Sequence, residues 1–261
     1  MEQWALITGA TAGIGQELAS VFAAHGHNLL LVARNEIRLR QTAVQLETAH
    51  QIKTDVLPGD LSRPNAAAEL FQAVGERRVE VLVNNAGFGR YGLFAKTELA
   101  VLTEMMQVNM CALVELTHLF LKPMLQRRSG RILNVSSTAA FQPGPTFNIY
   151  YATKAFVYSF SYALADEVAD TGVTVTTLCP GVTRTEFQER ANLSMDHGLG
   201  VMDARTVAEA GYRGLMLGKR VVIPGVLNKL GAFLGRRAPQ RLTNSIVKRL
   251  HGPRQASRGS A

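Results

Sequence analysis

The chain has 261 residues, of which 47% are hydrophobic and 18% are charged, and this composition excludes a disordered chain. A chain of this length can bury a substantial core without disulfides or metals. Its two cysteines, Cys111 and Cys179, stand far apart and belong to no Cys/His cluster. We therefore expect two reduced core thiols and no metal site.

The net charge of +8 is concentrated at one end of the chain. From Lys219 onward the sequence contains ten Lys and Arg residues and no Asp or Glu, whereas the preceding part has 18 basic and 20 acidic residues. No stretch approaches the roughly 20 apolar residues of a membrane-spanning helix. The first apolar run, at residues 4–7, ends at once in a glycine-rich turn, unlike a signal peptide. We expect a cytoplasmic protein with a basic C-terminal segment.

Short apolar runs alternate with stretches of helical periodicity through most of the chain. Strands are expected at residues 4–7, 28–32, 52–57, 81–83, 131–135, 173–178 and 220–223. Helices are expected at residues 16–25, 37–48, 66–74, 99–121, 150–170 and 206–217. Pro123 should stop the fourth of these helices, and Gly172 should cap the fifth.

Apolar strands that alternate with helices predict a parallel sheet covered on both faces. We therefore expect an α/β protein with a single doubly wound domain of the Rossmann type over residues 1–224. Its central parallel sheet should have about seven strands, with ligands at their carboxyl ends. Residues 225–261 should add basic amphipathic helices as a C-terminal extension.

The first chemical signal follows the first expected strand, where residues 8–15 read Thr-Gly-Ala-Thr-Ala-Gly-Ile-Gly. Glycines allow a tight turn and the close approach of a diphosphate, and the next helix offers its N-terminal N–H groups to the negative charge. The spacing is GxxxGxG rather than the GxGxxG of the dinucleotide fingerprint. Alone, the motif indicates a nucleotide site only weakly, and an ordinary turn is the alternative.

Three side chains further along can take part in proton transfer. Tyr150 and Lys154 lie one helical turn apart and share a face of their helix. The ammonium should move the pKa of Tyr150 from near 10 toward neutrality, where a phenol can exchange a proton with a substrate oxygen. Ser137, just after an expected strand, can hydrogen-bond the same oxygen, whereas Ser136 should face the other way. Singly, each residue also fits an ordinary surface or loop position.

These signals occur in one order and at fitting distances, together with Asn84-Asn85-Ala86-Gly87, Asn109 in a helix, and Pro180-Gly181 after a strand. The ordered set, over residues 4–223, resembles the short-chain dehydrogenase/reductase family. No motif position is missing. The resemblance implies a nicotinamide-dependent oxidoreductase that moves a hydride to or from a carbonyl or alcohol.

The resemblance also implies a role for each motif residue. In the catalytic set, Ser137 polarises the carbonyl, Tyr150 donates or accepts the proton, and Lys154 lowers the pKa of Tyr150 and binds the nicotinamide ribose. Asn109 holds a water beside Lys154 through its backbone. The implied cofactor-binding residues are Gly9, Thr11, Gly13, Ile14, Gly15, Arg34, Asp60, Leu61, Asn85, Ala86, Gly87, Tyr150, Lys154, Pro180, Gly181, Val182 and Thr185. Among them, the three glycines at 9, 13 and 15 hold the diphosphate, Asp60 contacts the adenine amino group, and Val182 and Thr185 fix the carboxamide.

The end of the second expected strand indicates which nicotinamide cofactor is used. An NAD site places an acidic residue here to bind the ribose hydroxyls. This chain instead has Ala33 followed by Arg34, whose guanidinium can bind a phosphate in bidentate fashion, with Arg38 in support. We therefore predict NADPH (NADP+), although many NADPH-dependent relatives carry a second basic residue where this chain has Ala12. The alternative is that Arg34 is only a solvated surface charge.

Two apolar segments should flank the substrate. One, expected to be a lid, is residues 186–201, with Phe187, Leu193, Met195, His197 and Gly198. The opposite wall should be residues 141–149, with Pro143, Pro145 and Phe147, joined by Phe88 and Tyr91. These groups indicate a hydrophobic small-molecule carbonyl or alcohol substrate, such as a 3-oxoacyl thioester, a steroid-like ketone or a long-chain aldehyde, and ordinary core or lid packing is the alternative.

The segment 226–250 alternates apolar and basic residues at helical spacing, and Pro239 should divide it into two helices. Such helices can lie on an anionic membrane surface, or can cover the enzyme or a partner subunit. No recognition motif supports nucleic-acid binding. The family resemblance implies a homodimer or homotetramer joined through the helices at 99–121 and 150–170. The alternatives to a reductase are a catalytically silent NADPH-binding regulator and a membrane-peripheral scaffold of the same fold.

Overall fold

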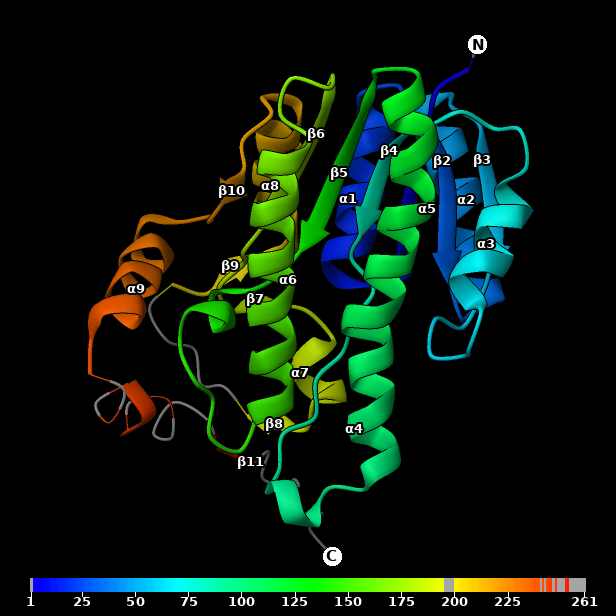
Figure 1. Ribbon diagram of the computed structural model, residues 1–261. Helices are drawn as coiled ribbons and strands as arrows, with labels where there is room; N and C mark the ends of the chain where they lie inside the picture. The colour runs from blue at the N-terminus through cyan, green and yellow to red at the C-terminus, as the bar shows by residue number, and fades with distance from the viewer. Residues whose placement is uncertain are drawn as a thin grey trace, which may run out of the picture.

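A seven-stranded parallel sheet forms the centre of the computed structural model, which describes residues 2–194 and 200–239 and, beyond them, residues 241, 243–245, 247, 252 and 253. The strand order is β10–β6–β5–β4–β1–β2–β3 (Figure 1). The strands are β1 (Trp4–Thr8), β2 (Asn28–Ala33), β3 (Thr54–Pro58), β4 (Val79–Asn84), β5 (Gly130–Val135), β6 (Val173–Leu178) and β10 (Val221–Val222). The predicted doubly wound α/β fold with a sheet of about seven strands is confirmed.

Helices cover both faces of this sheet. They are α1 (Gly13–Ala24), α2 (Glu36–His50), α3 (Ala66–Val74), α4 (Leu99–Met106), α5 (Ala112–Gln126), α6 (Asn148–Glu167) and α8 (Ala204–Met216). One core cluster joins the sheet to α3, α5 and α6, and the other joins it to α1, α2 and α8. Within β1, Leu6 belongs to the first cluster while Ala5 and Ile7 belong to the second. This alternation explains why the strands read as nearly continuous apolar runs.

Smaller elements lie around the carboxyl ends of the strands. They are two 3-10 turns, η1 (Phe94–Lys96) and η3 (Thr138–Phe141), the short helix α7 (Phe187–Arg190), and the two-residue strands β7 (Thr183–Arg184), β8 (Leu193–Ser194), β9 (Met202–Asp203) and β11 (Gly252–Pro253). Strand β7 pairs with β9, and β8 pairs with β11. The helix α9 (Val226–Arg237) follows β10 and packs against η3. Much of the second expected tail helix lies outside the described residues.

The long expected helix at residues 99–121 differs from the prediction in two ways. Helix α4, a π turn η2 (Gln107–Cys111) and α5 run on without a break to Gln126, so Pro123 does not stop the helix. Proline removes only its own N–H from the helical hydrogen bonds, and Pro123 lies in the last turn, where Arg127 N–H still donates to the Pro123 carbonyl at 3.3 Å.

The stretch Leu99–Gln126 is also long and apolar enough, by length and composition, to cross a membrane, so the expectation that no such stretch exists is wrong. One face of α5 packs into the core against the sheet, through residues that include Leu116, Phe120 and Met124. A helix that covers a sheet can have the same length and apolar composition, and we assign Leu99–Gln126 that role.

Two further sequence expectations are corrected. Helix α6 ends at Glu167 with Val168 as its C-cap, so Gly172 is not the cap. Gly172 instead has φ +87° at the entry to β6, where a Cβ would lie 2.1 Å from the carbonyl oxygen of Arg128. Cys179 is buried, as expected, whereas Cys111 is exposed in the π turn and is not a core thiol.

A chain of buried polar side chains ties together the central strands and the helices that carry the site. Asn84 at the end of β4 donates from Nδ2 to Thr117 Oγ1 on α5 at 3.0 Å and to Asn134 Oδ1 on β5 at 2.9 Å. Asn134 Nδ2 in turn donates to Ser161 Oγ on α6 at 2.9 Å. Because buried polar groups are costly when unpaired, this chain fixes β4, β5, α5 and α6 relative to one another.

Asn134→Ala should therefore reduce the free energy of unfolding by about 2–4 kcal/mol, because it leaves Asn84 and Ser161 without a shared partner in the core. The matched control is Asn28→Ala, which removes a single hydrogen bond, from the Lys53 N–H at 2.9 Å near the surface. Its cost should be at most about 1 kcal/mol. Urea denaturation measures both, and equal losses for the two variants would contradict a stabilising role for the buried chain.

Candidate active site

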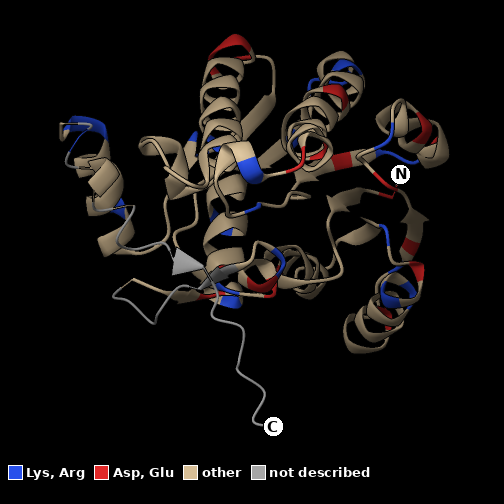
Figure 2. Ribbon diagram, turned by 90° about the horizontal axis from the view of Figure 1, so that it is seen from below, with Lys and Arg blue, Asp and Glu red and all other residues tan. Residues whose placement is uncertain are grey.

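A pocket of about 780 Å³ opens at the carboxyl ends of the strands, the edge that Figure 2 views from below. Its size fits a small-molecule site. All the residues predicted to bind the cofactor line it, from the glycine-rich turn to the segment after β6, and so do Ser137, Tyr150 and Lys154. Asn109 is the one residue of the predicted catalytic set that does not line the pocket, because its side chain is buried in the protein. The structure thus brings together motifs that are spread over more than 170 residues of sequence.

The glycine-rich turn at the start of α1 leaves no room for side chains. A Cβ on Gly9, at φ +68°, would lie 2.8 Å from Asn85 Nδ2, and a Cβ on Gly15 would lie 2.1 Å from the Gly9 carbonyl oxygen. Ala12 caps α1 without a side-chain hydrogen bond, so its first N–H groups are left for a ligand. A diphosphate fits such a cradle, because it accepts these hydrogen bonds and balances the positive end of the helix dipole.

Thr8 and Asn85 fix this turn to the neighbouring strand. Thr8 Oγ1 donates to the Val83 carbonyl at 3.2 Å and accepts from the backbone N–H groups of Asn85 and Ala86, each at 3.0 Å. Asn85 Nδ2 donates to the Thr8 carbonyl at 2.9 Å. The carboxyl ends of β1 and β4 are therefore held side by side, and both contribute to the floor of the pocket.

Two arginines stand at the end of the pocket formed by β2. Arg34 Nη1 lies 3.5 Å from Glu104 Oε1, and Arg38 Nη1 lies 3.4 Å from Glu186 Oε2. Both arginines are well exposed, so these ion pairs are weak and the guanidinium groups remain available to an anion.

Asp60 lies at the same end of the pocket. Burial opposes ionisation of Asp60, but hydrogen bonds from Ser62 and the nearby charges of Arg34 and Arg63 outweigh it and lower its pKa. The carboxylate is therefore ionised at neutral pH and can accept a hydrogen bond from an amino group.

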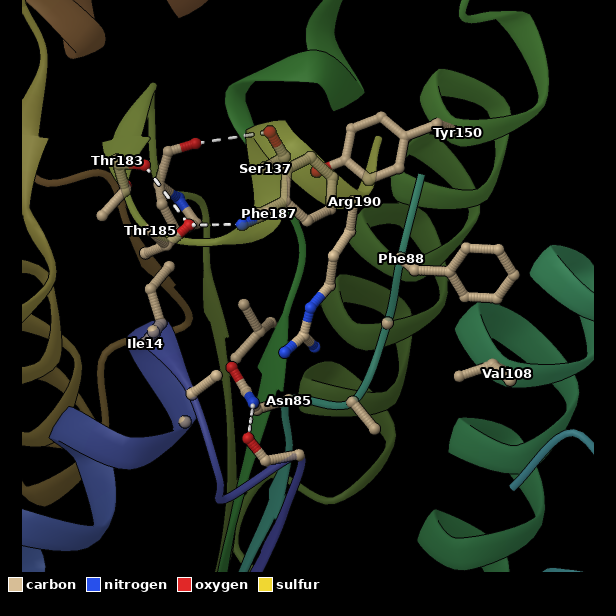
Figure 3. Close-up of a pocket in the computed structure, with 18 of the residues that line it drawn as sticks. Ile14, Asn85, Phe88, Val108, Ser137, Tyr150, Thr183, Thr185, Phe187 and Arg190 are labelled. Carbon is tan, nitrogen blue, oxygen red and sulfur yellow. Dashed lines mark hydrogen bonds between the residues drawn. The ribbon is translucent and has the colours of Figure 1, made fainter. Parts of the chain in front are cut away.

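The predicted catalytic side chains lie together at the other end of the pocket: Ser137, Tyr150 and Lys154. Ser137 follows β5, and Figure 3 shows the Tyr150 hydroxyl of α6 directed toward it. The Ser137 hydroxyl donates to the Pro180 carbonyl at 3.4 Å. Lys154 Nζ lies 5.7 Å from the centre of the Tyr150 ring and donates to the Val135 carbonyl at 3.0 Å. Ser136 points away from this cluster, as expected, and its hydroxyl donates to the Lys154 carbonyl at 2.7 Å.

The electrostatics of this cluster differ from the prediction. Burial raises the pKa of Tyr150 to about 12, and the polar side chain of Ser137 acts less strongly in the opposite direction. Burial also lowers the pKa of Lys154 to about 8. The expectation that Lys154 moves the pKa of Tyr150 toward neutrality is therefore wrong for this arrangement, because desolvation of the phenolate outweighs the distant ammonium. Tyr150 is a protonated phenol at neutral pH.

Asn109 supports the cluster from the π turn between α4 and α5. Its Oδ1 accepts from the Phe88 N–H at 3.0 Å, and its Nδ2 donates to the Phe88 carbonyl at 2.9 Å and to Thr153 Oγ1 at 3.1 Å. A π turn adds a residue to the helix and often marks a functional site. In this structure Asn109 joins the segment after β4, through Phe88, to α6, through Thr153, the residue next to Lys154.

Aromatic side chains pack against the Tyr150 ring. The ring of Phe147 stacks on Tyr150 with 4.5 Å between centres, and Phe187 of α7 lies 5.3 Å away. Of the residues expected at the substrate walls, Phe88, Phe147 and Phe187 line the pocket. Tyr91 packs behind them, and Pro143 and Pro145 are not among the lining residues. Met195, His197 and Gly198 lie outside the described residues.

Several lining residues carry no sequence signal. Figure 3 shows the Arg190 side chain extending from α7 into the pocket, between Tyr150 and Ser137 at one end and Asn85 at the other. Gln142 and Tyr151 join the aromatic end, and Asn228 and Val247 reach the pocket from the C-terminal segment. Val247 is buried beside Phe147 and Tyr151. Arg190 and Gln142 belong to the segments expected to flank the substrate but are not singled out there. Asn228 and Val247 come from the tail, where no motif indicates a pocket residue.

Comparisons with known proteins agree with this geometry. The family model for "short chain dehydrogenase" matches residues 3–196. A hydroxysteroid dehydrogenase-like protein 1 of Gallus gallus is 32% identical over 91% of this chain and 72% of its own length. A very-long-chain 3-oxoacyl-CoA reductase of Laccaria bicolor is 38% identical over 66% of this chain, but the match spans only about half of that protein, 52%.

A solved structure covers the whole chain. The short-chain dehydrogenase from Sphingobium yanoikuyae, in complex with NADPH, superposes with a TM-score of 0.82 at 31% identity, over 100% of this chain and 98% of its own. The fold, the ordered motifs and the family model all point to one assignment. The chain belongs to the short-chain dehydrogenase/reductase family of oxidoreductases.

Proposed function

We propose that this protein is an NADPH-dependent oxidoreductase that interconverts a hydrophobic ketone, aldehyde or 3-oxoacyl compound and its alcohol. The observation that carries the proposal is the convergence of Ser137, Tyr150 and Lys154 at the end of a pocket that begins at a diphosphate cradle (Figure 3). When bound, the nicotinamide supplies or accepts the hydride at the substrate carbon.

The protein's own side chains transfer the proton and bind the substrate oxygen. Because the pKa of Tyr150 is about 12, its phenol is protonated at neutral pH and can donate its proton to the developing alkoxide during reduction. Ser137 donates a second hydrogen bond to the same oxygen and stabilises the negative charge. Lys154, whose pKa of about 8 leaves it mostly charged at pH 7, favours the phenolate that Tyr150 becomes. In the oxidative direction the same proton returns to Tyr150.

The substrate class is supported by the aromatic end of the pocket and by the relatives. Phe147, Tyr151 and Phe187 surround the place where a substrate oxygen must meet Tyr150. Apolar walls favour a substrate with an apolar body. The name of one relative, a very-long-chain 3-oxoacyl-CoA reductase, points to the same chemistry.

We also propose a homodimer or homotetramer joined through α5 and α6. Only 33% of the apolar window in Leu99–Gln126 is buried within this chain. Helix α6 leaves Phe156 and Tyr162 exposed, and Leu125 is exposed on α5. Apolar groups on two neighbouring long helices are the kind of surface that a second subunit covers.

Tyr150→Phe should lower kcat/KM by about 10²–10⁴-fold, because it removes the proton donor and keeps the ring. NADPH binding should be nearly unchanged. A responsive substrate is first found by NADPH absorbance with a panel of ketones, aldehydes, acyl thioesters and sterols. Tyr158→Phe, on the same helix and outside the pocket, is the control and should keep full activity. Unchanged turnover in Tyr150→Phe would refute the mechanism, and NADPH binding by a wild-type protein with no turnover would favour the silent regulator.

Arg34→Ala should lower the preference for NADPH over NADH, measured as the ratio of the two kcat/KM values, by roughly 10–100-fold, because a charged hydrogen bond to a phosphate is worth about 1.5–3 kcal/mol. Arg40→Ala is a matched control. Arg34 and Arg40 have equally exposed side chains and each pairs with a glutamate, but Arg40 does not line the pocket. The assignment to NADPH is wrong if the ratio changes equally in both variants or in neither.

Lys154→Met should abolish most activity and yet stabilise the fold at pH 7. The unfolded chain holds the Lys154 proton up to a pKa of about 10.5, whereas burial lowers the folded value to about 8. Below pH 8 the folded state bears the full cost of a buried ammonium, and above pH 10.5 this cost is gone. In urea denaturation the variant should therefore be more stable by on the order of 1–3 kcal/mol at pH 7, with the gap closing as pH rises from 8 to 10.5. This account of Lys154 would be contradicted if the variant were less stable than the wild type at pH 7, or if the difference between their free energies of unfolding did not change with pH.

A further inference from the structure

Helix α9 presents its apolar side to solvent. Its largest apolar residues follow the spacing of a single helical face, and we call them the outer stripe: Val226, Leu227, Leu230, Phe233 and Leu234. Their exposed fractions are 79%, 53%, 54%, 52% and 52%. A surface helix ordinarily turns such a face toward the core. Contiguous exposed apolar residues of this kind mark an interaction surface.

The opposite side of α9 is firmly attached to the enzyme. Ala232 is buried in a cluster with Phe141 and Cys179. The guanidinium of Arg236 lies over the rings of Phe141 and Tyr158, at 4.4 and 4.8 Å from their centres. The outer stripe is therefore exposed because α9 is docked by its small and polar residues, and a rotation that buried the stripe would break these contacts.

The charge on the helix that carries the outer stripe is entirely positive. Lys229 and Arg237 lie on α9, and the Arg237 guanidinium stacks on the Phe233 ring at 4.1 Å. Helix α9 has no acidic residue, as Figure 2 shows at the left edge of the molecule. The whole sequence from Lys219 onward carries ten basic residues and no acidic one. A matching partner surface must therefore be both apolar and anionic.

We propose that the outer stripe of α9 docks on an anionic phospholipid surface. A helix that combines an apolar face with basic residues lies in the plane of the membrane, with the apolar side chains among the acyl chains and the basic groups at the phosphates. The cytoplasmic leaflet, which is rich in anionic lipid, fits this requirement. A second copy of the chain fits poorly, because twofold packing of two stripes would bring Lys229 and Arg237 of both copies together.

Docking through α9 has a consequence for the pocket. Asn228, on the attached side of the same helix, lines the pocket and donates to the Pro224 carbonyl at 2.9 Å. A membrane bound at the outer stripe would thus lie one helix diameter from the pocket wall. If the proposed function is correct, a hydrophobic substrate could reach the site from the lipid phase. The docking itself does not depend on that function.

The test is flotation of the full-length protein with vesicles of phosphatidylcholine, with and without phosphatidylserine. The wild type should float with the anionic vesicles and much less with the neutral ones or at high salt. Leu230→Ser combined with Phe233→Ser should weaken binding by about tenfold or more, because two apolar side chains leave the bilayer. Lys229→Glu combined with Arg237→Glu should lose the preference for phosphatidylserine.

The matched control is Val44→Ser combined with Leu217→Ser, which removes two similarly exposed apolar side chains away from α9 and should bind like the wild type. Circular dichroism checks that each variant is folded. The proposal is overturned if the wild type does not float, or if the control loses as much binding as the stripe variant. It is also overturned if light scattering shows that the stripe variant only reduces the size of an oligomer while flotation stays unchanged, since a second copy would then be the occupant.

Discussion

The placement of the Tyr150 hydroxyl toward Ser137 and beside Lys154 is the constraint on which the proposed chemistry depends (Figure 3). It brings the loop after β5 and the first turn of α6 to one point, and it places a protonated phenol beside a buried ammonium. Burial keeps the phenol neutral, and it opposes the charge on the ammonium. A bound substrate oxygen that gains negative charge can be stabilised by both hydroxyls, which is the condition that catalysis of this kind requires.

The parallel sheet and its buried polar chain keep these groups in place. Asn84, Asn134 and Ser161 connect β4, β5 and α6 through the core, and Asn109 connects α6 to the segment after β4. The glycine-rich turn is fixed to β4 by Thr8 and Asn85. The two ends of the pocket are therefore parts of one rigid framework, while the aromatic walls come from more peripheral segments around Phe147 and Phe187.

Local patterns were sufficient to predict the fold, because near-continuous apolar strands and amphipathic helices each have a direct physical cause. The motif residues were assigned to one site through the ordered set and its family resemblance, because each motif alone is a weak signal. Local patterns failed where the outcome depends on tertiary packing: Pro123 is tolerated inside the last turn of α5, and burial rather than Lys154 sets the pKa of Tyr150. Asn228 and Val247 reach the pocket from the C-terminal segment, which has no site motif, so no local pattern could reveal them.

The central claim is that Tyr150 delivers its proton to a substrate oxygen at the end of a dinucleotide site. A crystal structure of the protein with NADP+ and an unreactive ketone tests it most directly. The account predicts that the ketone oxygen accepts hydrogen bonds from both Tyr150 Oη and Ser137 Oγ, each within about 3.2 Å, with the diphosphate on the turn at Gly9 and Gly15. A ketone oxygen bound away from Tyr150, or a dinucleotide outside this pocket, would contradict it.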